Sequence, residues 1–259
     1  MNIQQFYQQS AQASLNASLA AFIPSIALLI YAYFIAQNFQ LSILVIPFLI
    51  YSFFCYQKFL IHQNRAKEVK LSPLNNEPSR ANIFEKKLLI TFMPAPSLRM
   101  IFFTPNGMKA GEIRDESFLF IRWFLPNFID KLLMKKYVLY DDLDRPIAFY
   151  HDLKDRILII SPNHQEMAAI YKTKNGKKKE FFFETKSVLV NNNSLQDYSF
   201  ITSDGTQLVK VQTGWMPLEW GQRFVDANTP ILSMKEDLSE SESIQLFSLF
   251  ITLYKYGNH

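Results

Sequence analysis

Residues 19–60 contain two long apolar runs, in the sequence LAAFIPSIALLIYAYFIAQNFQLSILVIPFLIYSFFCYQKFL. The runs cover residues 19–36 and 41–60, and a short polar break, QNFQ, separates them. The first run holds nine Leu, Ile or Phe residues, and each of these contributes about −0.3 to −0.6 kcal/mol to membrane insertion. The second run has the length of about 20 residues that a bilayer core requires. We therefore predict a membrane protein in which residues 1–62 form a two-helix transmembrane hairpin.

Two other interpretations of these runs agree less well with the sequence. Buried helices of a soluble core would show a polar face, and neither run has one. A cleaved signal peptide would begin with a positively charged segment, which residues 1–18 lack. Pro24 and Pro47 lie inside the runs, but membrane helices tolerate proline where neighbouring helices satisfy the freed backbone groups.

Positive charges predict the orientation of the hairpin. Lys58, Arg65, Lys67 and Lys70 crowd the end of the second run, whereas the break between the runs has no charge. Because cytoplasmic loops are enriched in Lys and Arg, the chain after the second run is expected in the cytoplasm, and two crossings return its start to the same side. We predict a cell-membrane protein with two spans, whose two termini and C-terminal domain are cytoplasmic.

The rest of the chain divides into a linker and a β-rich domain. Residues 63–84 are polar, include Pro73 and Pro78 and lack periodicity, so we interpret them as a linker. Residues 85–259 carry short runs rich in Phe, Tyr, Ile and Val, which are typical of an antiparallel sheet. Asn175-Gly176 and Asp204-Gly205 are the strongest hairpin turns, because a type I′ turn needs positive φ at both central residues. The expected strands are 87–92, 100–104, 137–140, 147–151, 156–160, 167–172, 179–183, 187–191, 198–202, 207–212 and 231–234.

The last apolar segment predicts the shape of this domain. Residues 239–242, SESE, form a capping box, and a helix is expected over residues 240–256. Its apolar residues cover every side, so it must be enclosed all round, and its apolar stretch is too short to cross a bilayer. A closed or nearly closed sheet around the helix meets this need, and a helix packed on one sheet face is the alternative. The predicted fold is an α+β, mostly antiparallel, barrel-like sheet around a buried C-terminal helix.

Two segments of this domain resemble the tubby C-terminal-like domain, the barrel-around-a-helix fold of tubby-like proteins, LURP-one-related proteins and phospholipid scramblases. Residues 136–148, KYVLYDDLDRPIA, look like the strand, acidic turn, strand unit of that family, and residues 198–212 resemble the strands that lead to its final helix. Arg145-Pro146 stand where a glycine is more usual, and we count eleven strands where the family barrel has twelve. The resemblance covers residues 86–259 and is to a membrane-anchored, bacterial-type member of the family. It implies a fold and a function at a membrane, and it supplies no catalytic residues.

The chain lacks the signatures of common enzyme classes. Its seven glycines occur singly, so there is no phosphate-cradling loop and no dinucleotide fingerprint. His164 and Glu166 match the H-x-E part of zinc deaminases, but the only cysteine, Cys55, lies in the second apolar run, so the cysteine pair is missing. Residues 141–144, DDLD, lack the glycine and the closing glutamate of a calcium loop. We predict no catalytic residues, no metal, no cofactor and, without a dense basic face, no nucleic-acid partner.

A cluster of lysines is the first candidate binding feature. Lys172, Lys174, Lys177, Lys178 and Lys179 flank the turn at Asn175-Gly176. A cationic hairpin tip of this kind attracts anionic lipid headgroups with about 1 kcal/mol per lysine. Lysines also protect the edges of hairpins from aggregation, and this role is the alternative.

A basic, aromatic segment is the second candidate. Residues 118–135 are expected to form a helix in which Arg122, Trp123, Phe124, Lys131 and Lys135 take part in the pattern of an interfacial helix. Packing over one end of the barrel is the alternative. Trp215 and Trp220, which flank Met216-Pro217, are expected to pack in the core or against a loop.

These features predict a membrane-anchored, non-enzymatic cytoplasmic domain that binds lipid, a small ligand or a membrane partner in a regulatory or adaptor role. The expected partners are the bilayer itself and either anionic lipid or another membrane protein. Scramblase-like lipid transport is an alternative that rests on one branch of the resembling family. A structural subunit of a membrane assembly, with the hairpin as its working part, is the other alternative.

Overall fold

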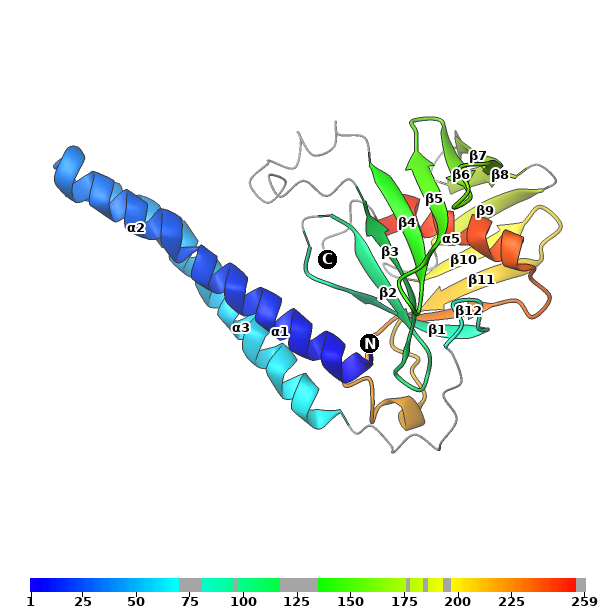
Figure 1. Cartoon of the computed structure of the whole chain (residues 1–259), viewed down its shortest axis with the longest axis horizontal. Helices are drawn as coiled ribbons and strands as arrows, with labels where there is room; N and C mark the ends of the chain where they lie inside the picture. Colours follow the sequence, from blue (N-terminus) through cyan, green and yellow to red (C-terminus); the bar gives the residue numbers. More distant parts are fainter. Residues whose placement is uncertain are drawn as a thin grey trace. The chain divides into compact units, whose positions relative to one another are not determined.

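The computed structural model describes residues 1–69, 81–95, 97–116, 135–175, 178–183, 186–192 and 197–254. The chain forms two compact units, a helical unit over Ile3–Lys70 and a barrel unit made of Met1–Asn2 and Leu71–His259. In Figure 1 the helical unit runs from blue to cyan, and the barrel unit ends in the red helix α5 (Glu240–Tyr254).

The helical unit is a hairpin with two long arms. The first arm contains α1 (Ile3–Ala20), α2 (Phe22–Ile30) and a π-helical turn at Tyr31–Ile35, and the second contains a 3-10 segment at Phe39–Val45 and α3 (Ile46–Glu68). The predicted polar break forms the turn: Gln37 has a φ of 49°, and the Asn38 side chain accepts a 3.1 Å hydrogen bond from the Gln40 N–H. The sequence prediction of a two-helix hairpin is therefore confirmed.

Proline positions explain why the apolar runs stay helical. Pro24 lies in the first turn of α2, and Pro47 lies at the start of α3. First-turn residues have no intrahelical N–H partner to lose, and the fixed φ of proline suits this position. Each proline therefore marks a segment start and does not break an arm.

Both arms are long and apolar enough to cross a membrane. They span Ile3–Ile35, with 33 residues, and Phe39–Glu68, with 30 residues, and the most apolar 18-residue windows of the two arms have mean hydropathies of 2.0 and 1.9. At about 1.5 Å per residue such helices exceed a hydrocarbon core of about 30 Å. The helix α3 also continues past residue 62, so residues 63–68, which the sequence assigned to the linker, are helical.

Buried serines join the two arms. The Ser18 and Ser52 hydroxyls lie 2.9 Å apart, and each also donates to the backbone carbonyl of the other residue, at 3.0 and 3.1 Å. Small residues allow helices to approach closely, and hydrogen bonds between helices replace the hydrophobic driving force that lipid does not supply.

The barrel unit is a closed antiparallel meander in which every strand pairs with its sequence neighbours and β1 pairs with β12. The closed ring confirms the predicted fold class. The strands are β1 (Lys87–Phe92), β2 (Arg99–Phe103), β3 (Lys109–Asp115), β4 (Lys136–Asp141), β5 (Pro146–Asp152), β6 (Arg156–Ile160), β7 (Glu166–Asn175), β8 (Lys178–Phe182), β9 (Ser187–Asn192), β10 (Tyr198–Thr202), β11 (Gln207–Gln212) and β12 (Ile231–Met234).

The barrel has one strand more than the sequence predicted. The additional strand is β3, whose sequence, KAGEIRD, has only one large apolar residue, Ile113, and therefore lacks the usual strand pattern. It pairs antiparallel with β2, where the register shifts between Phe102 and Phe103, and antiparallel with β4. The predicted turn at Asp204-Gly205 joins β10 to β11, but only Gly205 has a positive φ, at 85°, so the turn is not of type I′. Gly176, in the other predicted turn, lies outside the described residues.

The helix α5 fills the barrel. Its apolar residues Ile244, Leu246, Phe247, Leu249, Phe250 and Ile251 are all buried, together with the inward side chains of the strands. The Phe247 and Phe250 rings lie 5.0 Å from Phe102 and 5.2 Å from Phe200, measured between ring centroids. Figure 1 shows α5 within the ring of strands. The predicted capping box is also present, since Glu242 accepts a 3.0 Å hydrogen bond from the Ser239 N–H and donates its own N–H to Ser239 Oγ at 3.2 Å.

Candidate functional site

A cavity of about 420 Å³ opens at one end of the barrel. Its walls come from the start of β3, the turn between β4 and β5, the start of α5 and the segment of residues 81–84 that leads into β1. These pieces are far apart in sequence, and the closed barrel brings them together. The cavity lies within the barrel unit.

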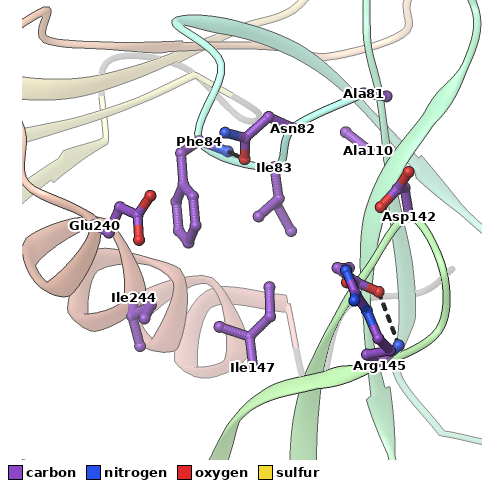
Figure 2. A pocket seen from close by; sticks show the side chains of 11 residues that line it. Ala81, Asn82, Ile83, Phe84, Ala110, Asp142, Arg145, Ile147, Glu240 and Ile244 are labelled. Atoms are coloured by element: carbon purple, nitrogen blue, oxygen red, sulfur yellow. Dashed lines mark hydrogen bonds and ion pairs between the residues drawn. The ribbon is translucent and has the colours of Figure 1, made fainter. Parts of the chain in front are cut away.

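The floor of the cavity is apolar. Figure 2 shows Ile83, Phe84, Ile147 and Ile244 directed toward its centre. Residues 81–84 belonged to the predicted linker, yet Ile83 is buried and packs with the barrel core. The sequence signal for this role was limited to two adjacent apolar residues, Ile83 and Phe84, just before the first strand.

A glycine in β3 makes room for the Ile83 side chain. A Cβ atom at Gly111 would lie 2.4 Å from Ile83 Cδ1 and 2.4 Å from the Tyr140 carbonyl oxygen. Both distances are far below van der Waals contact, so only glycine leaves room for the Ile83 side chain at this position. The local turn is fixed by Asn82, whose side chain accepts a 3.0 Å hydrogen bond from the Phe84 N–H.

Charged side chains surround the apolar floor. Asp141, Asp142 and Glu240 contribute three carboxylates, and Arg145 contributes the single guanidinium. Figure 2 shows Arg145 and Asp142 on one side of the cavity and Glu240 on the other. The cavity therefore combines an apolar interior with a net negative rim.

Asp141 and Arg145 form the rigid part of this rim. Asp141 Oδ2 accepts a 2.8 Å hydrogen bond from Arg145 Nε, and Oδ1 accepts from the N–H groups of Leu143 and Arg145 at 2.9 and 2.8 Å. Burial alone raises the pKa of Asp141, but the hydrogen bonds from Arg145 and Leu143 outweigh it and leave the pKa below its ordinary value. In the same turn Asp144 adopts a φ of 59°, a conformation that aspartate tolerates.

A buried ion cluster supports the cavity wall from the outer face of β3. Glu112 is fully buried and contacts Lys109 at 3.1 Å, Arg114 at 2.9 Å and Arg99 at 3.5 Å. Lys109 Nζ also lies 2.6 Å from Asp144 in the cavity-lining turn. A buried carboxylate is stable only when it is paired in this way.

The same part of β3 binds the first two residues of the chain. The Lys109 N–H donates a 3.0 Å hydrogen bond to the Met1 carbonyl, and Asn2 forms an antiparallel bridge with Met108. Lys109 therefore links residues 1–2 with the wall of the cavity. No sequence pattern predicts this bridge.

The structure describes the side chains of two of the five lysines that the sequence grouped as a lipid-binding tip, Lys172 and Lys179. The ammonium group of Lys172 binds the Asp152 carboxylate and the Leu153 carbonyl, so it fastens β7 to the β5–β6 hairpin. Lys179 is exposed, next to the tip, and pairs in register with Lys174. Lys177 and the side chains of Lys174 and Lys178 lie outside the described residues.

The other predicted features that the structure describes include Lys135 and Trp215. Arg122, Trp123, Phe124 and Lys131 of the predicted interfacial helix lie outside the described residues, and Lys135, at its end, is only 8% exposed. The expectation that Trp215 packs in the core or against a loop is wrong, because this side chain is 72% exposed.

The polar residues considered for metal binding have structural roles. The His164 ring lies over the Phe149 ring with a centroid distance of 6.2 Å, and the backbone N–H of His164 closes a turn by donating to the Ser161 carbonyl. Asp141 and Asp144 bind Arg145 and Lys109. In the described part of the chain, no three His, Cys, Asp or Glu side chains are placed to hold a metal ion.

Comparisons with known proteins add no family assignment. No family model matches the chain, and neither a curated protein nor a solved structure has significant similarity to it.

Proposed function

We propose that this chain is a membrane-anchored, non-enzymatic module whose cytoplasmic barrel binds a small amphiphilic ligand in a regulatory or adaptor role. The observation that carries the proposal is the cavity at the end of the barrel, which has an apolar floor and a charged rim. Its volume falls within the range of about 300–1,000 Å³ that is usual for ligand sites.

The rim chemistry favours one class of ligand. Arg145 is neutralised by Asp141, so Asp142 and Glu240 determine the charge that a ligand meets. An apolar molecule with a positively charged or hydrogen-bond-donating group matches this arrangement, because the group reaches the carboxylates while the apolar part fills the floor.

Exposed apolar side chains support the membrane anchor. Along the arms of the hairpin large residues face outward, as in Ile23 at 71% and Phe34 at 75% exposure. A contiguous apolar surface of this kind is rare on soluble monomers and marks a membrane or protein contact. The length and hydropathy of both arms agree with a bilayer.

Two observations support a shared side for the barrel and both ends of the hairpin. Arg65 and Lys67 lie in the last turn of α3, as the positive-inside rule requires for a cytoplasmic end. Residues 1–2 belong to the barrel unit, and two crossings return the chain to the side where it began.

The resemblance to the tubby C-terminal-like domain agrees with a twelve-stranded barrel around a C-terminal helix. On this ground we propose that the barrel is related to that family. Scrambling stays a prediction without a supporting observation, since α5 fills the lumen of the barrel. Contact of the lysine-rich hairpin with anionic lipid also stays a prediction.

Ligand retention tests the proposal. The full chain is purified from membranes in mild detergent, and native mass spectrometry compares it with Ile147→Trp, which fills the cavity, and with Leu143→Trp, which alters an exposed position of the nearby turn. We expect a small molecule bound to the parent and to Leu143→Trp but lost from Ile147→Trp, with unchanged thermal melts. A parent without a bound molecule, or equal retention by both variants, would contradict it.

A further inference from the structure

The loop between β11 and β12 carries the two most exposed large apolar side chains of the described part of the barrel unit. Trp215 is 72% exposed and Leu218 is 95% exposed. A side chain with this exposure touches almost nothing, so it stands out from the surface. Neither residue lines the cavity at the end of the barrel.

The base of this loop is rigid. The Thr213 N–H donates a 2.9 Å hydrogen bond to Asp197 Oδ1, and Gly214 turns the chain with a φ of 79°. On the other side Phe224 is fully buried, with its ring 6.3 Å from the Phe103 ring.

Backbone hydrogen bonds also fix the tip. The N–H groups of Trp220 and Gly221 donate to the carbonyls of Pro217 and Leu218, at 3.0 and 3.1 Å, and form the single turn of 3-10 helix at Leu218–Trp220. These bonds give the tip a defined backbone conformation in which Trp215 and Leu218 are exposed. The fold of the barrel does not require this exposure.

The chemistry of the tip suits the surface of a bilayer. Tryptophan combines an apolar ring with an N–H donor and gathers at the headgroup level of membranes, and a protruding leucine enters the boundary between headgroups and acyl chains. The exposed Glu219 follows Leu218 directly, which limits the contact to a shallow depth. A protein partner would need a pocket for each protruding residue, whereas a bilayer accepts them without a matching shape.

We infer that the Trp215–Leu218 tip is a second membrane contact, which docks the barrel on the bilayer by shallow insertion of the two side chains. The inference rests on the proposed anchoring of the hairpin, which keeps the barrel close to the membrane and makes a weak contact effective. The contact limits the orientations that the barrel adopts on the membrane.

Tryptophan quenching by brominated lipids tests this contact in the full chain. The chain has three tryptophans, so Trp123→Phe and Trp220→Phe leave Trp215 as the only reporter. The protein is reconstituted into phosphatidylcholine vesicles with a minor fraction of anionic lipid, with and without bromine at a shallow acyl position. We expect strong loss of Trp215 emission with brominated lipid and weak quenching by aqueous acrylamide.

A matched reporter gives the control. Leu143 is 54% exposed in the turn between β4 and β5, and Leu143→Trp in a background with all three native tryptophans replaced by phenylalanine should keep its emission in brominated vesicles. Unquenched Trp215, or equal quenching at both positions, would overturn the inference. Labelling of Asn38→Cys from outside the vesicle or cell reports insertion of the hairpin separately, so loss of the anchor and loss of the tip contact give different results.

Discussion

The Tyr150 hydroxyl of β5 donates a 2.9 Å hydrogen bond to the carbonyl of Ile244 in α5. The Tyr150 side chain is fully buried, and burial raises the pKa of its hydroxyl well above the ordinary value. The group therefore stays protonated and remains a donor at neutral pH. This bond fixes the start of the helix against the wall of the barrel, next to the cavity.

Removal of this hydroxyl is expected to weaken the domain. Tyr150→Phe leaves the packing of the ring intact but deletes the buried bond, and loss of such a bond costs about 1–2 kcal/mol. Denaturant unfolding monitored by far-UV circular dichroism measures the change. Tyr171→Phe, at an exposed position on β7, is the control and should be neutral. An unchanged midpoint for Tyr150→Phe would show that the bond adds nothing to stability.

The enclosed helix gives a stronger test. Leu249 is fully buried in α5, and Leu249→Asp places a carboxylate where it has no partner, at a cost of several kcal/mol against a typical domain stability of about 5–15 kcal/mol. Truncation after Leu238 empties the barrel and removes its aromatic contacts. Both variants should lose cooperative thermal unfolding, whereas Leu143→Asp on the surface should retain it. A sharp transition in the truncated chain would contradict an essential role for the helix.

The capping box predicts a dependence of stability on pH. The hydrogen bond from Lys186 lowers the pKa of Glu242 from 4.5 to about 2, and Ser239 adds to this effect. A carboxyl with a lowered pKa in the folded state stabilises the protein above its ordinary pKa, and this contribution is lost as the pH falls toward 2. Between pH 5 and 2 the parent should therefore lose more stability than Glu242→Gln. If the unfolding midpoints of the parent and of Glu242→Gln changed equally with pH, the result would refute this contribution of Glu242 to stability.

The sequence predicted the parts of the fold that depend on local pattern. Apolar runs, turn residues and the capping box gave the hairpin, eleven strands and α5, because each of these signals lies within a few residues of the element that it predicts. The strand β3 was missed because its outward Glu112 is buried by ion pairs and its Gly111 accommodates Ile83, and the pattern of large apolar residues in a strand indicates neither arrangement.

The candidate site could not be predicted for the same reason. Its wall combines Ile83, Ala110, Arg145 and Ile244, which become neighbours only through the closure and register of the barrel. The exposure of Trp215 could not be predicted either, since the local sequence around an aromatic loop residue does not show whether its side chain packs or protrudes.

The serine pair should stabilise the hairpin. The Ser18→Ala/Ser52→Ala double variant removes both hydroxyl donors that bond between the arms, and such bonds in membrane proteins contribute about 0.6 kcal/mol each on average, so a loss of about 1 kcal/mol is expected. Unfolding in mixed micelles by increasing SDS measures it. Ser25→Ala, whose hydroxyl bonds only to Ala21 within its own arm, is the matched control. Equal effects of the two changes would show that the contact between the arms is not a source of stability.

Cysteine labelling tests the orientation of the hairpin. In a Cys55→Ser background the protein has no native thiol, so a single introduced cysteine reports its own side of the membrane. Asn38→Cys lies in the turn between the arms, and Asn192→Cys lies at the exposed end of β9. With Arg65 and Lys67 on the cytoplasmic side, a membrane-impermeant maleimide should label Asn38→Cys in intact cells and label Asn192→Cys only after permeabilisation. Arg65→Glu/Lys67→Glu removes the cations that set this orientation, and we expect it to produce a mixed labelling pattern. Labelling of Asn192→Cys in intact cells, with a protected Asn38→Cys, would place the barrel outside the cell.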